Sequence, residues 1–271
     1  MSEEKEMRIG FVGGGALTES IIKGINGTLL PADRIFVSDH KRERCAELIN
    51  KYNINATVGV DSFIDKISLL VVAVKPKDAE ATFKELVEYK DKITLNLTII
   101  SVIAGLKISA IEKYFPNNTI VRAMPNVALS VGEGMTAYIM NKNTSSIDRE
   151  TIKKLWSTVG RAVEVDEKLM DAVTGLSGSG SAYAFLMIEA MADGGVAAGL
   201  TKKVAVELAA QTLLGAAKMV LESEESPTIL RDKVTSPGGT TIEGVRMLER
   251  GSVRSSLIEA VLAATEKSKK L

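Results

Sequence analysis

The 271-residue sequence predicts an α/β protein in two parts, a doubly wound sheet in residues 1–166 and an all-helical domain in residues 167–271. Two patterns lead to this prediction. In the first part, short apolar runs of strand length alternate with stretches of helical periodicity, which is typical of parallel strands covered on both faces. From Lys168 onward the strand pattern disappears, and small and apolar residues recur at three- and four-residue spacing, as in closely packed helices.

The first element is an apolar run, Ile9 to Val12, that breaks into the glycines Gly13 to Gly15 and resumes at helical spacing. Strand, glycine turn and helix form the context in which a glycine fingerprint predicts dinucleotide binding. Gly13 would make the tight turn, and Gly15 would let a pyrophosphate approach the backbone at the helix N-terminus. Thr18 stands at the third small position, where the usual fingerprint has glycine or alanine. The stretch predicts a Rossmann-like domain.

The second expected strand, RIFVSD, ends about where a residue contacting the adenosine ribose should lie. Asp39 could accept from a ribose 2′-hydroxyl, which favours NAD. Lys41, Arg42 and Arg44 could instead face a 2′-phosphate, which favours NADP, and Ser38 fits either cofactor. Some of these charged residues could instead lie on the solvent-exposed face at the start of the next helix, so the sequence leaves the cofactor preference open.

Further strands are expected at ISLLVVAVKP, LTIISVIAG and TIVRAMPN, with a last one at GRAVEVDE. Their carboxyl ends would meet at one edge of the sheet, where open α/β sheets bind ligands. Lys75, in the first of these segments, is expected to contact the cofactor or its loop, and a solvated lysine at a strand end is the alternative.

The helical half contains a long expected helix, TKKVAVELAAQTLLGAAKMVLES, whose stripe of apolar and small residues includes Val204, Leu208 and Met219. A helix this apolar usually buries a face against a partner, so we expect a homodimer. Dimers could assemble further, and a monomeric bundle is the alternative.

The stretch VTSPGGTTIEGVRMLERG interrupts the helices with two glycines and two threonines. Thr240 as N-cap with Glu243 three residues later would form a capping box, leaving the Thr241 hydroxyl free for a ligand. Gly238 and Gly239 would leave the amides ahead of the helix uncovered, and such amides attract a carboxylate. The alternative is a well-capped helix after a tight turn.

Composition excludes several function classes. Lysine plus arginine equals aspartate plus glutamate, 34 against 34, which argues against nucleic-acid binding. Cys45 is the lone cysteine, and no CxxC pair or histidine cluster offers a metal site. The segment MSEEKEMR has no apolar core of a signal peptide, and no apolar run is long enough to span a bilayer. We expect a soluble cytoplasmic protein.

The stretches GFVGGGAL, AVKP, VRAMPN, LSGSGSAY and above all VTSPGGTTIEGVRMLE resemble Δ1-pyrroline-5-carboxylate reductases, the last enzymes of proline synthesis. The resemblance runs from about Met7 to Leu271, and its serine-proline-glycine-glycine-threonine segment is highly specific. It implies a Rossmann-type domain, an all-α dimerisation domain and an active site at their junction. It also implies NADP or NAD as the cofactor, with NADP favoured, and pyrroline-5-carboxylate as the substrate.

The resemblance further assigns residues to the two ligands. The residues implied to line the cofactor are Val12, Gly13, Gly14, Gly15, Ala16, Leu17, Ser38, Asp39, Ala73, Val74, Lys75, Pro76, Val102, Ile103 and Ala104. Those implied to bind the substrate are Glu224, Ser236, Gly238, Gly239, Thr240 and Thr241. Two positions depart from the family pattern: Thr18 replaces an alanine and could loosen helix–sheet packing, and Ser181 replaces a proline beside the substrate.

The implied reaction transfers a hydride to a cyclic imine carbon and a proton to its nitrogen, and alignment carries most of the work. His40, the only histidine, belongs to the ribose-side loop, so a histidine-based dehydrogenase mechanism has no candidate in the second half. We expect Thr241 to hydrogen-bond the ring nitrogen and help to relay its proton.

Two other functions remain as alternatives. A β-hydroxyacid dehydrogenase would need a lysine on a helix of the second domain, but Lys202, Lys203 and Lys218 show no pattern of polar partners. A cofactor sensor without turnover would have no need of a carboxylate-binding loop.

Overall fold

The computed structural model describes residues 7–94 and 96–270. The charged segment of residues 1–6, on which the expectation about a signal peptide rests, lies outside the described residues. By internal contacts the chain forms two compact units, which we call unit 1 (Met1–Gly178 and Ala264–Leu271) and unit 2 (Ser179–Ala263). The Ser268 hydroxyl donates to Asp171 Oδ1 at 2.8 Å within unit 1. The division expected from the sequence, at residues 166 and 167, stays a prediction.

Unit 1 is built around one mixed sheet. Its described strands are β1 (Ile9–Val12), β2 (Ile35–Ser38), β3 (Asn55–Thr57), β4 (Leu69–Val72), β5 (Thr98–Ser101), β6 (Thr119–Pro125), β7 (Gly134–Met140) and β8 (Gly160–Glu164). Their order is β3-β2-β1-β4-β5-β6-β7-β8. The strands from β3 to β6 in this order are parallel, whereas β7 runs antiparallel to β6, and β8 pairs parallel to β7.

Two strands were not expected from the sequence. β3 has only three residues, Asn-Ala-Thr, and none is fully buried, so it gives no apolar run. β7 follows β6 after one short 3₁₀ turn, η3 (Val127–Val131). A parallel connection needs a crossover of a dozen or more residues, so this short link forces β7 to run antiparallel. The sheet is therefore mixed at one end.

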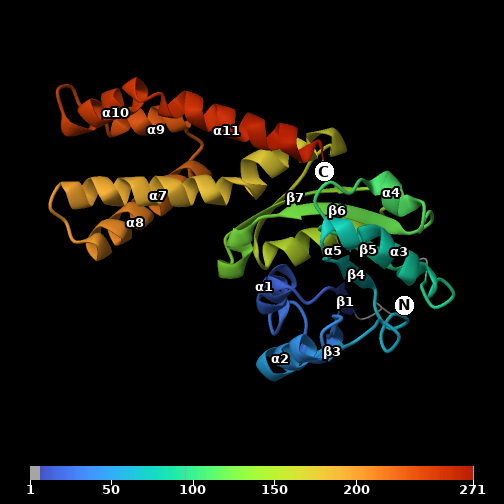
Figure 1. Ribbon diagram of the computed structural model, residues 1–271. Helices are drawn as coiled ribbons and strands as arrows, with labels where there is room; N and C mark the ends of the chain where they lie inside the picture. Colours follow the sequence, from blue (N-terminus) through green and yellow to red (C-terminus); the bar gives the residue numbers. More distant parts are fainter. Residues whose placement is uncertain (1–6, 95, 271) are drawn as a thin grey trace. The chain divides into compact units, whose positions relative to one another are not determined.

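Helices follow most of these strands, and α6 comes after the last one (Figure 1). They are α1 (Ala16–Ile25), α2 (Arg42–Tyr52), α3 (Ala79–Val87), α4 (Ile108–Glu112), α5 (Ser146–Ser157) and α6 (Met170–Val173). Short turns of other types are η1 (Ala32–Arg34), η2 (Pro76–Asp78), η4 (Glu167–Leu169) and the π-helical turn η5 (Thr174–Gly178).

The sheet is covered on both faces by separate cores. In β4, Leu69 and Val71 belong to one apolar cluster, and Leu70 and Val72 belong to the other. This alternation follows from the two-residue period of a strand. The first cluster includes residues of α1, α2 and α5, and the second includes residues of α3 and α4. The doubly wound architecture is thus confirmed.

Unit 2 consists of helices: α7 (Gly180–Ala197), α8 (Lys202–Glu222), α9 (Pro227–Lys233), α10 (Thr240–Arg250) and the first part of α11 (Val253–Ser268). α7 and α8 pack through small residues, Ala192, Ala205 and Ala209, beside Ile188. A side chain at Gly195 would meet Ala205 Cβ at 3.2 Å, so glycine permits this close approach.

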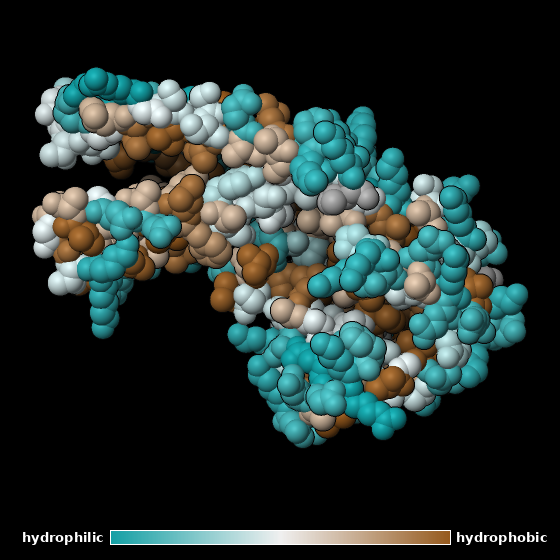
Figure 2. Space-filling model, in the orientation of Figure 1, coloured by the Kyte–Doolittle hydropathy of each residue, from teal (hydrophilic) through white to brown (hydrophobic). Residues whose placement is uncertain are grey.

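Many large apolar side chains of unit 2 are exposed, as the brown surface over α7 to α11 in Figure 2 shows. On α7 and α8 these include Phe185 at 64%, Leu186 at 66% and Leu208 at 53% exposure. Among the described helices, α8 is long and apolar enough to cross a membrane by length and composition alone, with 11% of its apolar window buried. Such a surface favours burial against another apolar surface.

Candidate functional site

A cleft of about 830 Å³ lies at the carboxyl edge of the sheet in unit 1. It brings together the segments that follow β1, β2 and β4, which are neighbours in the sheet although far apart in the sequence. Among the residues expected to bind the cofactor, those that line it are Val12, Gly13, Gly15, Ser38, Asp39, Ala73, Val74 and Lys75. The ligand edge predicted for the sheet therefore carries a cleft.

The glycine turn after β1 is built as the fingerprint requires. Gly13 has a φ of +96°, and a Cβ there would lie 2.6 Å from the Ala73 carbonyl oxygen. Its amide donates to the Ser38 carbonyl at 2.8 Å, which ties the turn to β2. Gly15 is the N-cap of α1, and a Cβ at Gly15 would meet nothing within 4 Å. The approach to the amides of α1 is thus open.

Thr18 strengthens this turn rather than loosening it. Its side chain is fully buried, and its hydroxyl donates to the Gly13 carbonyl at 2.6 Å. The expectation that Thr18 could weaken helix–sheet packing is therefore wrong, because its hydroxyl forms a hydrogen bond to the Gly13 carbonyl that an alanine could not form.

Gly14 is buried and is not among the described residues that line the cleft. Its amide donates to Asp39 Oδ2 at 2.8 Å, and its carbonyl accepts from Arg44 Nε at 2.6 Å. Asp39 Oδ1 also accepts from the Lys41 amide at 2.9 Å, and the side chain is 11% exposed. Both carboxylate oxygens of Asp39 thus hold backbone amides.

The charged residues after β2 divide into two groups. Lys41 and His40 line the cleft, and His40 Nδ1 lies 3.4 Å from Asp39 Oδ1. Arg42 and Arg44 are not among the described residues that line it. Arg44 is instead paired with Glu19 and Glu47, so the expectation that it could face a 2′-phosphate is wrong.

The other residues expected at the cofactor lie near this edge without lining the cleft in the described part of the chain. Ala16 and Leu17 begin α1, and Pro76 begins η2. Val102, Ile103 and Ala104 follow β5, which pairs with β4. Ile103 is 2% exposed and belongs to the second apolar core.

Several cleft residues were not expected from the sequence. They are Val58, Gly59, Val60, Lys77, Asp78, Thr82, Glu85 and Leu86. The first three follow β3, the short strand that has no apolar signal. Gly59, which has a φ of +80°, is a residue in the sequence that could have indicated a turn there. The others belong to η2 and α3, where an amphipathic pattern does not reveal which polar face meets a ligand.

The loop before α10, in unit 2, differs from its expected form. Gly239 is the N-cap of α10, and Thr240 is the first helical residue, so the expected capping box of Thr240 with Glu243 is wrong. The Glu243 carboxylate pairs with Arg246 at 2.8 Å instead. The reason is local: the Gly239 amide donates to the Ser236 carbonyl at 3.1 Å, which closes a turn one residue earlier.

This loop presents backbone and hydroxyl groups to the surface. Gly238 has a φ of +68°, and a Cβ on Gly239 would lie 2.3 Å from Ser236 Oγ. The side chains of Ser236, Thr240 and Thr241 are exposed. No side chain of the described residues caps the first amides of α10. Uncapped helix amides beside hydroxyls can bind a carboxylate.

Glu224 and Ser181 lie close to the ends of helices in unit 2: Glu224 follows α8, and Ser181 is in the first turn of α7. Glu224 is exposed and lies two residues beyond the end of α8. Its neighbour Glu225 pairs with Lys233 at 2.6 Å. Ser181 is the second residue of α7, where the first turn of a helix accepts either serine or proline. The departure from proline thus leaves the helix start intact.

The start of α7 follows a π-helical turn of small residues, η5. The Asn126 side chain donates to the Ser177 carbonyl at 3.3 Å and accepts from the Met135 amide at 3.1 Å. A Cβ at Gly178 would lie 2.9 Å from Met124 Cε. The end of β6 is therefore tied to η5 by contacts that need small side chains.

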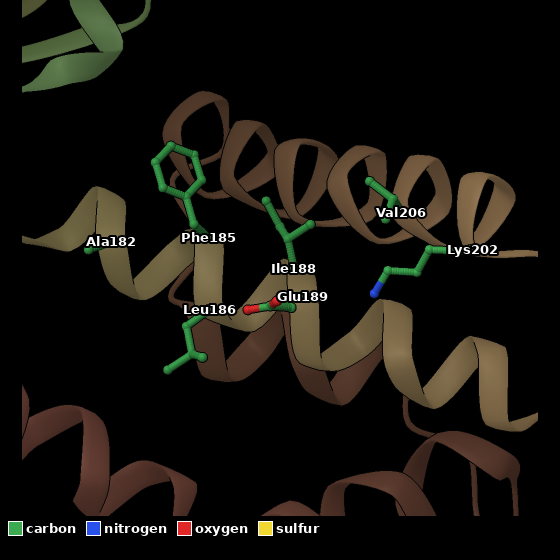
Figure 3. Close-up of a pocket in the computed structure, with 7 residues that line it drawn as sticks. All are labelled: Ala182, Phe185, Leu186, Ile188, Glu189, Lys202 and Val206. Atoms are coloured by element: carbon green, nitrogen blue, oxygen red, sulfur yellow. The ribbon is translucent and has the colours of Figure 1, made fainter.

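A second cavity, of about 550 Å³, lies on α7 and α8 in unit 2 (Figure 3). Its lining residues are Ala182, Phe185, Leu186, Ile188, Glu189, Lys202 and Val206. Five of these side chains are apolar, and the two charged ones are Glu189 and Lys202, of which Lys202 pairs with Asp193 at 2.5 Å. Within residues 7–94 and 96–270, no group of three or more metal-binding side chains is present.

Comparison with known proteins connects both units to one enzyme family. The family model described as pyrroline-5-carboxylate reductase dimerisation matches residues 167–271. A second model, NADP oxidoreductase, coenzyme F420-dependent, matches residues 8–105. The chain is 42% identical over 267 residues to the pyrroline-5-carboxylate reductase of Synechocystis sp., and the match covers 98% of each protein.

Solved structures agree. A pyrroline-5-carboxylate reductase from Coxiella burnetii is similar with a TM-score of 0.89 at 34% identity, over 97% of this chain and 98% of that one. A pyrroline carboxylate reductase from Plasmodium falciparum, solved with NADP bound, has a TM-score of 0.86 at 31% identity, over 98% of both chains.

Proposed function

This chain belongs to the pyrroline-5-carboxylate reductase family, and on that premise we propose which of its residues carry the reaction. It transfers a hydride from NAD(P)H to the cyclic imine of Δ1-pyrroline-5-carboxylate and thereby makes proline, the last step of proline biosynthesis. A cofactor sensor without turnover and a β-hydroxyacid dehydrogenase, the two alternatives from the sequence, are therefore set aside. The observation that carries our assignment is the cleft at the carboxyl edge of unit 1.

We place NAD(P)H in this cleft, where it would supply the hydride. The left-handed Gly13 turn and the open space at Gly15 support a pyrophosphate at the N-terminus of α1. The residues proposed to hold the cofactor are Val12 to Leu17, Ser38, Asp39, Ala73 to Pro76 and Val102 to Ala104. Val58, Gly59 and Val60 join them, since they line the same cleft.

We propose a preference for NADPH over NADH. Both oxygens of Asp39 already accept from backbone amides, which reduces its capacity to accept from a ribose 2′-hydroxyl. Lys41 and Ser38 line the same end of the cleft and would bind a 2′-phosphate. A lysine ammonium beside a phosphate gains a charge-assisted hydrogen bond that a ribose hydroxyl cannot match.

The substrate carboxylate is proposed to bind the loop from Ser236 to Thr241. The Ser236 hydroxyl and the backbone amides of Gly238 to Thr241 would hold it, and Glu224 is proposed as a further substrate residue. The uncapped start of α10 supports this role, because its amides and the helix dipole both favour an anion.

Thr241 is proposed to be the catalytic residue. Hydride addition to the imine carbon moves the electron pair of the C=N bond onto the nitrogen, which takes or keeps a proton. The Thr241 hydroxyl would hydrogen-bond this nitrogen and help to relay its proton. Its exposed position in the first turn of α10 leaves it accessible to a ligand.

The test compares two substitutions at Thr241. Thr241→Val keeps the shape but removes the hydroxyl, and we expect kcat to fall by about ten- to a thousandfold, the scale of one oriented donor. Thr241→Ser keeps the hydroxyl and should stay within about fivefold of the natural protein on that scale. NADPH affinity should be unchanged in both. A Thr241→Val enzyme with full turnover would refute the catalytic role.

The chain forms a homo-oligomer through its dimerisation domain. We propose that the unit is a homodimer in which a second copy covers the apolar surface of α7 and α8, including the cavity of Figure 3. Burial in such an interface accounts for the apolar character of α8 without a membrane. Dimers could assemble further. We also propose a cytoplasmic protein that binds no nucleic acid, in keeping with its balanced charge.

A further inference from the structure

The backbone of Gly14 is held both at its amide and at its carbonyl, which belong to the two peptide groups on either side of this residue. Asp39 accepts from its amide at 2.8 Å, and Arg44 Nε donates to its carbonyl at 2.6 Å. A glycine turn has no side chains with which to pack, so backbone hydrogen bonds fix its orientation. A Cβ at Gly14 would come within 3.2 Å of Asp39 Oδ2, so glycine also lets the turn approach its partners.

Arg44 is itself fixed from two helices. Its guanidinium pairs with Glu19, in the first turn of α1, and with Glu47 of α2 at 2.9 Å. Glu19 also accepts from Lys51 Nζ at 2.7 Å and from the Tyr52 hydroxyl at 3.0 Å. The Arg44 side chain is 24% exposed. A planar guanidinium with this many partners has little freedom, so it can set the position of the Gly14 carbonyl.

The same contacts neutralise the negative charge of Glu19. Hydrogen bonds from Arg44 and Lys51 lower the pKa of Glu19 from its ordinary 4.5 to about 2, so the carboxylate is ionised at neutral pH. Glu19 lies in the first turn of α1, and Gly15, the N-cap of this helix, lines the cofactor cleft. An unpaired carboxylate there would repel a pyrophosphate. Arg44 and Lys51 neutralise it.

We propose that Arg44 is a positioning residue for the cofactor pyrophosphate, which acts through the Gly14 carbonyl, and so through the peptide that joins Gly14 to Gly15, and by neutralising Glu19. It does not read the 2′-phosphate, since its guanidinium is committed to Gly14, Glu19 and Glu47. The pyrophosphate is common to both cofactors. Loss of Arg44 must therefore weaken the binding of NADPH and the binding of NADH by the same factor. This inference rests on the cofactor cleft proposed above.

The experiment measures the Kd of NADPH and of NADH by nicotinamide fluorescence, with kcat at saturating cofactor. Arg44→Met should raise both Kd values by about tenfold, the scale of one hydrogen bond to a charged group, and leave their ratio and kcat unchanged. Lys41→Met, in contrast, should raise the Kd of NADPH alone. Glu43→Gln, which removes an exposed carboxylate of α2 that is not paired with Arg44, should behave as the natural protein.

Two results would overturn the proposal. An Arg44→Met protein that loses affinity for NADPH alone would make Arg44 a 2′-phosphate ligand, and one with both Kd values unchanged would leave it no role in binding. Melting temperatures without cofactor show whether each variant folds. If Arg44→Met does not fold, Arg44→Lys should show a smaller but still equal loss for both cofactors. Failure of the natural protein to bind either cofactor would instead refute the proposed cleft.

Discussion

At the scale of single residues, Thr18 and Asp39 show how position changes the role that a residue type suggests. Thr18 looks like a poor substitute for a small residue, yet its buried hydroxyl ties α1 to the Gly13 carbonyl. Asp39 looks like a ribose ligand, yet it holds the amides of Gly14 and Lys41. Both side chains form hydrogen bonds to the backbone of the glycine turn.

The role of Thr18 can be tested by stability. Thr18→Val keeps the volume but removes the hydroxyl, and leaves the Gly13 carbonyl without this donor. We expect the free energy of unfolding to fall by about 1–2 kcal/mol in urea denaturation. Thr18→Ser, which keeps the hydroxyl, should lose less. Equal stability of Thr18→Val and the natural protein would show that the hydrogen bond contributes nothing.

At the scale of elements, the sequence predicts what burial dictates. β1, β4, β5 and β6 are apolar and buried, so their residue pattern reveals them and, through them, the ligand edge. β3 is formed by pairing with β2 rather than by its own residues, so the cleft residues after it could not be predicted. The start of α10 was misplaced by one residue, because a hydrogen bond within the turn outweighed a capping box.

The junction of α1 and α2 gives a prediction about pH. The pKa of Glu19 is near 2 in the folded protein and near 4.5 when it is unpaired. The stability that its ion pairs contribute is therefore fully present above about pH 4.5 and is lost as the pH falls toward 2. Urea unfolding at a series of pH values should show natural protein and Glu19→Gln differing above pH 5 and converging below pH 4.5. A constant difference down to pH 2 would contradict this assignment.

At the scale of the whole molecule, the two units differ in how much of their apolar surface they bury by themselves. Unit 1 buries an apolar core on each face of its sheet and leaves a cleft at the carboxyl edge. Unit 2 has a small core of alanines and leaves large apolar side chains exposed. A helical unit with this much exposed apolar surface is stabilised when a second copy covers that surface. The sequence could predict this need from the apolar stripe of α8, although not which side chains a second copy covers.

The homodimer can be tested on α8. Leu208 is 53% exposed, so Leu208→Glu should leave the fold of one copy intact but place a charge in the proposed interface. Light scattering after size exclusion should then show a shift from oligomer toward monomer. Lys153→Glu, an exposed charge change on α5 in unit 1, is the control and should leave the mass unchanged. A Leu208→Glu protein with the oligomeric mass of the natural protein would place the interface elsewhere.

The most direct test of the assigned reaction is the loss of reduced-nicotinamide absorbance with Δ1-pyrroline-5-carboxylate, run in parallel with NADPH and NADH. We expect turnover with both cofactors and a higher kcat/KM for NADPH, because Lys41 lines the cleft while both carboxylate oxygens of Asp39 accept from backbone amides. A higher kcat/KM for NADH would contradict the assignment of the ribose site. Cofactor binding without any turnover would contradict the substrate assignment itself.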